Sequence, residues 1–174
     1  GDILHKKGEE QEAFAAYDSC LQWKDDNVMA LNNYAYYLSE KGVDLHKAES
    51  MSYKTIKAEP NNGTYLDTYA WILFMEERYA DAKIYIDQAL KNRDSTADNS
   101  TVIEHAGDIY YMNGMADESV DFWKKAYTGE NQTEVLAWKI KNRQYITEEE
   151  LKKRNAPKQK PAATQKSVRK GKKK

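Results

Sequence analysis

The chain has 174 residues, of which 40% are apolar and 32% are charged, so a folded, charge-rich protein with one ordinary domain or a short repeat array is expected. The single cysteine, Cys20, excludes an intrachain disulfide and a zinc site built on cysteines. The net charge of −1 is unevenly distributed, because residues 152–174 carry 11 Lys or Arg and no acid, which leaves a net charge of −12 on residues 1–151.

Small residues recur at a nearly constant interval, starting from the first residues of the chain. Steps of 34, 35 and 37 residues separate Gly1, Ala35, Ala70 and Gly107. Steps of 35, 34 and 37 residues separate Ala13, Ala48, Ala82 and Ser119. Registers that agree on a period of about 34 residues indicate a stack of repeats, each of which is one supersecondary unit.

In chain order, this period gives a partial unit at residues 1–27 and three complete units at 28–62, 63–96 and 97–133. The complete units share large and small residues at matching places: Leu31, Tyr34, Ala35, Leu38, Gly42 and Ala48; Leu66, Tyr69, Ala70, Leu73, Tyr79 and Ala82; and Ile103, Ala106, Gly107, Tyr110, Gly114 and Trp123. This pattern resembles the tetratricopeptide repeat, and its tyrosine-rich stretches are similar to repeats of large bacterial tetratricopeptide proteins. Glu77 departs from the pattern, because the family usually has Gly in the turn inside a repeat.

The resemblance implies an all-α protein, an α-α superhelix or solenoid of about four helix-pair repeats. The residues agree with this expectation, because Leu66, Tyr69, Ala70 and Leu73 follow the i, i+3, i+4, i+7 spacing of one helix face. The small Ala70 would let a paired helix approach to the ~8–10 Å that is usual for packed helices. Each pair would bury its apolar faces against its own partner helix and the neighbouring repeats.

The two ends of the array are expected to differ. The partial unit lacks most of its first helix, which would leave Phe14 and Tyr17 exposed, so we expect the chain to be the C-terminal part of a longer protein. Residues 134–151 alternate apolar residues with Lys and Arg and end in a Thr-Glu-Glu-Glu helix start, so capping helices are expected there. The lysine-rich residues 152–174 cannot bury a core and are expected to form a disordered basic tail.

The sequence offers little support for catalysis. The three histidines, His5, His46 and His105, match no metal-ligand or catalytic-triad spacing, and the sequence has no glycine-rich phosphate loop. We therefore expect a non-enzymatic protein without a cofactor or a metal. His105 is expected to be a hydrogen-bonded surface residue.

A binding role is better supported. In the tetratricopeptide family the first helices of the repeats line a concave groove that holds a peptide, and the matching positions here are Asn33, Tyr36, Asp67, Trp71, Met75, Glu104, His105 and Asp108. None of these is Lys or Arg, so a clamp for a peptide carboxylate is not expected. An acidic groove with aromatic side chains suits a protein or peptide partner with basic and apolar side chains. The alternative is that Trp71 and Met75 only pack against the neighbouring repeat.

These observations favour a non-enzymatic protein–protein interaction scaffold. One alternative is an adaptor whose basic tail binds nucleic acid, another anionic polymer or a membrane surface. Another is the C-terminal regulatory part of a larger protein with an upstream domain. The resemblance also leads us to expect the bacterial cell envelope, on the periplasmic side, with any signal sequence lying upstream of Gly1.

Overall fold

The computed structural model describes residues 1–6, 8–24 and 26–156, including their side chains apart from those of Leu4 and His5. Within these residues the regular elements are all helices. They are α1 (Asp2–Lys6), α2 (Glu10–Trp23), α3 (Val28–Lys41), α4 (Leu45–Ala58), α5 (Gly63–Met75), α6 (Tyr79–Asn92), α7 (Ser100–Met112), α8 (Ala116–Ala126), a short 3₁₀ helix (Gly129–Asn131), α9 (Glu134–Asn142) and α10 (Glu148–Asn155). None of the described helices is long and apolar enough to cross a bilayer.

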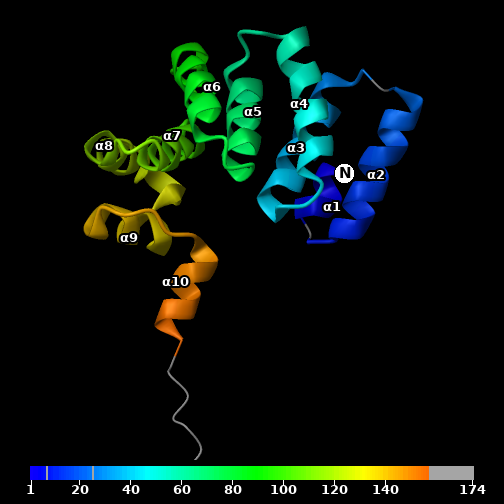
Figure 1. The fold of residues 1–174 in the computed structure, drawn as a ribbon. Coiled ribbons are helices and arrows are strands. Elements are labelled where there is room, and N and C mark those ends of the chain that lie inside the picture. The colour runs from blue at the N-terminus through cyan, green and yellow to red at the C-terminus, as the bar shows by residue number, and fades with distance from the viewer. Residues whose placement is uncertain (7, 25, 157–174) are drawn as a thin grey trace, which may run out of the picture.

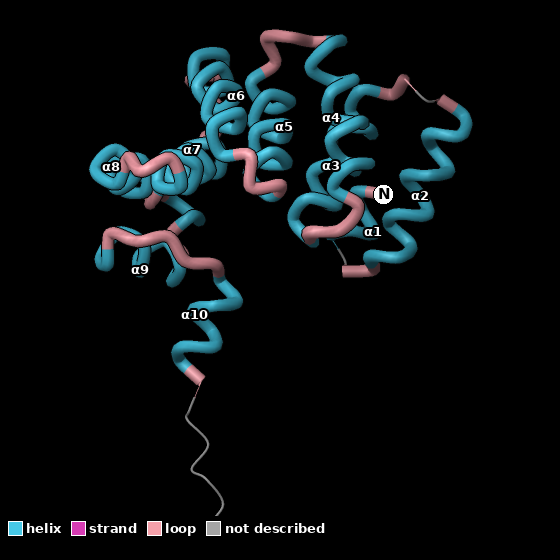
Figure 2. Tube along the Cα trace, viewed as in Figure 1, coloured by secondary structure: helices cyan, strands magenta, loops and turns pink. Residues whose placement is uncertain are grey.

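The helices form hairpin-like pairs that follow one another in a curved array (Figure 1). The pairs α3–α4 and α5–α6 stand upright in that view, whereas α7 and α8 are seen nearly along their axes. The connection 59–62 crosses over the tops of α4 and α5 (Figure 2), and the connection before the turned pair, residues 93–99, is longer in sequence. The predicted all-α solenoid is confirmed.

The turn inside each complete repeat has the same backbone geometry. Gly42, Glu77 and Gly114 have positive φ angles of 64°, 61° and 78°. The residue after each of them donates its N–H to a carbonyl in the last turn of the first helix, as Val43 does to Leu38 at 3.1 Å. This is a Schellman ending, in which a left-handed residue lets the chain satisfy carbonyls that the helix end leaves free. Glu77 therefore departs from the family pattern at a position where the backbone favours glycine.

Small residues bring the helices of a pair close together. Ala35, Ala70, Ala82 and Ala89 are completely buried. Gly107 lies in an even tighter place, because a Cβ built there would overlap the indole of Trp123 on the paired helix α8. The recurring small residues of the sequence therefore mark the contacts between paired helices.

The apolar core is continuous along the array, and the middle helix α5 connects its parts. Ile72 of α5 is completely buried in a cluster with Leu38 of α3 and Tyr17 of α2. Leu73, on the next position of the same helix, is completely buried in a second cluster that reaches Ile109 of α7. Each repeat is thus covered by its neighbours, as expected for a solenoid.

The N-terminal end is better covered than the sequence predicted. Tyr17 is only 4% exposed, its ring stacks on Tyr34 of α3 with centroids 5.1 Å apart, and its hydroxyl donates to Asp2 of α1. Phe14 is half-buried. The predicted exposure of Tyr17 is wrong, because α3 of the following repeat packs against its ring and Asp2 of α1 accepts from its hydroxyl.

The C-terminal end consists of α9 and α10. Thr147 starts α10 with a capping box, since its hydroxyl accepts from the N–H of Glu150 and the Glu150 side chain accepts from the N–H of Thr147. The helix then continues to Asn155, so the basic tail that the sequence placed from residue 152 begins within α10. Basic residues are favourable there because the last turn of a helix carries partial negative charge. The remainder of the predicted disordered tail, from Pro157 onward, lies outside the described residues.

Candidate functional site

An open hollow of about 460 Å³ lies between the first helices of the three complete repeats, α3, α5 and α7, and residues 131–148, which we call the C-terminal segment. Six of the eight predicted groove residues line it: Tyr36, Trp71, Met75, Glu104, His105 and Asp108. The structure therefore brings together residues from three different repeats. Asn33 is not among the lining residues, because its side-chain amide donates to the carboxylate of Asp2 at 3.2 Å. Asp67 lies behind the hollow and is only 6% exposed.

His105 holds α5 and α7 together at the floor of the hollow. Its Nδ1 lies 2.9 Å from Oδ1 of Asp67, and the residue is only 7% exposed. Burial lowers the pKa of His105, but the neighbouring Asp67 carboxylate outweighs burial, so the pKa lies above its ordinary value. The expectation of a surface histidine is wrong, because the two first helices pack closely enough to enclose the ring.

Trp71 combines the two roles that the sequence analysis set against each other. Its indole stacks on the His105 imidazole, with centroids 4.0 Å apart and an angle of 13° between the planes, and also on Phe74 at 4.7 Å. It is nevertheless only half-buried and lines the hollow. Met75 likewise lines the hollow, with its methyl group near the turn at Gly42 of the preceding repeat. Packing between repeats thus fixes an apolar surface that also faces outward.

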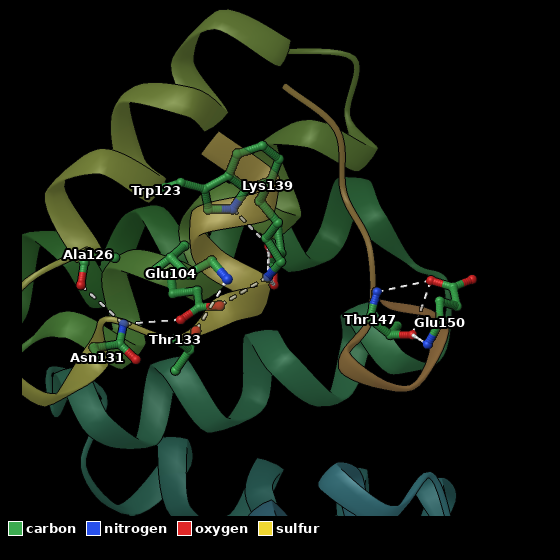
Figure 3. Close-up of polar contacts among 10 residues, drawn as sticks. Glu104, Trp123, Ala126, Asn131, Thr133, Lys139, Thr147 and Glu150 are labelled. Carbon is green, nitrogen blue, oxygen red and sulfur yellow. Dashed lines mark hydrogen bonds and ion pairs between the residues drawn. The ribbon is translucent and has the colours of Figure 1, made fainter. Parts of the chain in front are cut away.

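Lys139 of α9 is a lining residue that the sequence analysis missed. Its ammonium lies 2.7 and 2.9 Å from the two oxygens of Asp108 and 3.0 Å from Glu104, and the side chain is only 4% exposed (Figure 3). Asp108 also accepts a hydrogen bond from the Trp123 indole at 2.8 Å. Burial lowers the pKa of Lys139, but Asp108 and Glu104 outweigh it and raise the pKa above its ordinary value. A signal was present in the sequence, because Lys139 follows Leu136 by three residues and so shares its buried face.

The charges in the hollow are mostly paired with one another. Lys139 is the one lysine among the described lining residues, which include no arginine, and it is paired with both Asp108 and Glu104. Glu40 of α3 and Glu148 at the start of α10 are exposed at the rim. The hollow therefore has an aromatic floor, an ion cluster with one more carboxylate than ammonium on one side, and an acidic rim.

The comparisons with known proteins agree with this architecture. No family model matches the sequence. A TPR repeat-containing protein of Pseudomonas aeruginosa is 35% identical over 66 residues, which make up 38% of this chain and 11% of that protein. The crystal structure of MamA superposes with a TM-score of 0.63 at 17% identity, over 82% of this chain and 81% of that one.

The chain has the fold of a tetratricopeptide-repeat array. Two further structures share its fold. PilF of Pseudomonas aeruginosa superposes with a TM-score of 0.67 at 16% identity, over 80% of this chain and 62% of that one. YrrB, a tetratricopeptide protein with an unusual peptide-binding site, superposes with a TM-score of 0.59 at 14% identity, over 72% of this chain and 62% of that one.

The chain spans only about a tenth of the curated relative that it matches.

Proposed function

We propose that the tetratricopeptide array binds a peptide segment of a partner protein in the hollow between α3, α5, α7 and the C-terminal segment. The observation that carries this proposal is the position of Trp71, whose indole is held by stacking on His105 and still lines an open hollow. A large aromatic side chain that is already fixed loses little conformational entropy when it meets a ligand. Such side chains commonly provide the anchors of protein interfaces.

The charge of the hollow favours a peptide with basic and apolar side chains. Asp108 and Glu104 are engaged by Lys139, and Asp67 is engaged by His105. Glu40 at the rim is exposed and accepts only a hydrogen bond from the Tyr36 hydroxyl, at 3.1 Å, so it can receive a Lys or Arg of the peptide. An apolar side chain, or the stem of that Lys or Arg, would rest on Trp71.

The test begins with selection of binders from a display library of short random peptides against the untagged chain. The affinity of an enriched peptide is then measured by isothermal titration calorimetry for the wild type, Trp71→Ala and Glu40→Lys. Tyr53→Ala is the matched control, because Tyr53 is an exposed aromatic residue of a second helix, 47% exposed and outside the hollow.

Loss of the Trp71 anchor should weaken binding by ~2 kcal/mol, which is about a thirtyfold increase in Kd. Glu40→Lys should weaken binding of basic peptides, and the weakening should shrink as salt is added. Enriched peptides without a basic residue, or equal affinities for Trp71→Ala and Tyr53→Ala, would contradict the proposal. Circular dichroism checks that each variant keeps its helix content.

The basic tail supports a second candidate function, in which the chain is an adaptor for an anionic polymer or a membrane surface. Its support is the charge of residues 152–174, which carry 11 Lys or Arg and no acid. Deleting residues 157–174 should then abolish salt-sensitive binding to anionic vesicles or nucleic acid. If the intact chain binds neither anionic vesicles nor nucleic acid at low salt, this function is excluded.

Two further parts of the proposal concern the whole protein. The small share of the curated relative that the chain spans is compatible with a regulatory role beside an upstream domain. The resemblance to repeats of large bacterial tetratricopeptide proteins supports a location in the cell envelope. Fractionation of cells that express the full-length protein tests this location directly.

A further inference from the structure

We propose that His46, Glu49 and Glu76 form a site for a divalent transition-metal ion such as Zn²⁺. The three side chains each offer a ligand atom, and these atoms all lie within 4.8 Å of one another. His46 and Glu49 lie in the first turns of α4, and Glu76 is the residue that ends α5. An ion at this place would link one repeat to the next, and none of the three residues lines the hollow.

The observation that points to a ligand is an unsatisfied oxygen on Glu76. The side chain is nine-tenths buried, with 10% of its surface exposed. Its Oε1 is buried and accepts no hydrogen bond, although it lies 3.6 Å from Nδ1 of His46. A buried carboxylate oxygen without a partner is costly, because it has lost its hydration. A metal ion between this oxygen and the imidazole would satisfy it.

The geometry allows the three ligands to close around one ion. His46 and Glu49 are three residues apart on one helix and therefore share a face. The His46 side chain is 99% exposed, so its ring is free to rotate toward the carboxylates. Bonds of ~2.0–2.2 Å to Zn²⁺ place neighbouring ligand atoms ~3.4 Å apart. His46 and Glu76 are close to this separation at 3.6 Å, and rotation of the His46 and Glu49 side chains would bring in the third ligand atom, since all three lie within 4.8 Å of one another. One imidazole and two carboxylates leave a fourth position for water.

Arg78 holds the two carboxylates together when no ion is bound. Its Nη1 lies 2.7 Å from Glu49 and 3.2 Å from Glu76, and its Nη2 lies 3.3 Å from Asp81. A bound cation would compete with this guanidinium for the negative charge of the same two carboxylates, although Arg78 contacts Oε2 of Glu76 and the ion would bind Oε1. Arg78 can then keep Asp81 as its partner while it releases the other two. Removing the arginine should therefore tighten metal binding.

The sequence analysis expected no metal because it searched for ligands at short spacings. His46 and Glu49 have the spacing of a single helical turn but are only two ligands. Glu76 comes from the next repeat, 30 residues after His46, and stacking of the repeats brings it to the same place. Such a set becomes visible only when the repeats are packed.

The experiment is a titration of the untagged chain with Zn²⁺ at pH 7.5 by calorimetry, in a buffer that does not chelate metals. The wild type should bind one equivalent at this site. Loss of an outer-shell partner alone typically lowers metal affinity by about 10–100-fold, so His46→Ala and Glu76→Gln should lower it at least tenfold. Glu118→Gln, at an exposed acid of α8, is the control and should leave affinity unchanged.

Arg78→Gln distinguishes specific binding of Zn²⁺ by the three ligands from nonspecific attraction of Zn²⁺ to acidic groups on the surface. It should bind Zn²⁺ more tightly than the wild type, since it removes a competing positive charge. His46 is exposed and its replacement does not disturb the core, so loss of binding in His46→Ala cannot be ascribed to unfolding. No saturable binding by the wild type, unchanged affinity in His46→Ala or weaker binding by Arg78→Gln would each overturn the proposal.

Discussion

At the scale of single residues, Glu77 shows how one repeat departs from its neighbours. Its φ of 61° matches those of Gly42 and Gly114 in the equivalent turns, but its side chain has a Cβ that crowds the backbone in this conformation. Replacing Glu77 by glycine removes this strain from the folded state but also raises the conformational entropy of the unfolded state. The free energy gained by removing the strain is the larger of the two. Glu77→Gly should therefore raise the free energy of unfolding by about 0.5–1 kcal/mol.

Urea denaturation followed by circular dichroism measures this change as a shift of the midpoint. Glu77→Ala is the matched control, because it removes the carboxylate but keeps the Cβ. If the alanine variant gains as much stability as the glycine variant, backbone strain at Glu77 is not the cause.

Also at the residue scale, the ion pair between His105 and Asp67 makes the site sensitive to pH. The folded state raises the pKa of His105, so the stability that the pair provides is fully present below the ordinary histidine pKa of ~6.5. It is lost as the pH rises through the raised value. Burial lowers the pKa of His105 and the Asp67 carboxylate raises it. Because Asp67→Asn removes that carboxylate, we expect the pKa of His105 to fall.

An NMR titration of the imidazole signals checks this prediction in both proteins. His46→Ala in each background removes the His46 signal from the spectrum and leaves the pair of His105 and Asp67 intact. A His105 pKa that is the same with and without the Asp67 carboxylate would show that Glu104 and Asp108 control it instead.

At the scale of elements, α9 is attached to α7 through a buried ion cluster as well as through apolar packing. Lys139 is 4% exposed and is held by Asp108 and Glu104. Lys139→Ala leaves Asp108 buried without its cation, which should lower the free energy of unfolding by about 3–5 kcal/mol. Lys141→Ala, at an exposed lysine of the same helix, should change it by less than ~0.5 kcal/mol.

A double-mutant cycle with Asp108→Ala separates this ion pair from the rest of the packing. The double variant should lose much less stability than the two single losses combined, because Asp108, the more deeply buried of the two carboxylates, is no longer left without its cation. Additive losses, measured by urea denaturation, would mean that Lys139 contributes to packing and not to charge neutralisation.

The same elements show how far the sequence could predict the site. The 34-residue period and the i, i+3, i+4, i+7 faces predicted the helix pairs. The resemblance to the tetratricopeptide family then implied that Tyr36, Trp71 and His105 face a groove, and all three line the hollow. Neither the period nor the resemblance could predict that His105 would be enclosed, because the distance between α5 and α7 depends on packing along the whole stack. Lys139 was missed because the segment after the last repeat follows no repeat register, so nothing in the period says where α9 lies.

At the scale of the whole molecule, the array behaves as a stack in which each repeat depends on its neighbours. The helix α2, near the N-terminal end of the array, buries only Ala13 and Tyr17, whereas α5 in the middle buries eight of its residues. In a repeat protein, stability is approximately the sum of the repeats and the interfaces between them. Amide hydrogens in α5 should therefore exchange more slowly than those in α2.

The last prediction concerns the two apolar clusters on either side of α5, one shared with α3 and the other with α7. It tests whether each cluster stabilises mainly its own half of the stack. Ile72 is buried against α3, and Ile109 of α7 belongs to the cluster on the other side of α5. Ile72→Ala and Ile109→Ala should each cost about 2–5 kcal/mol, since each leaves a cavity in a packed core. Hydrogen exchange with mass spectrometry should show lost protection mainly in α3 and α4 for the first variant and mainly in α7 and α8 for the second. Equal loss throughout in both variants would instead mean that the array unfolds as one cooperative unit, because interfaces between repeats are then too strong for any part to open alone.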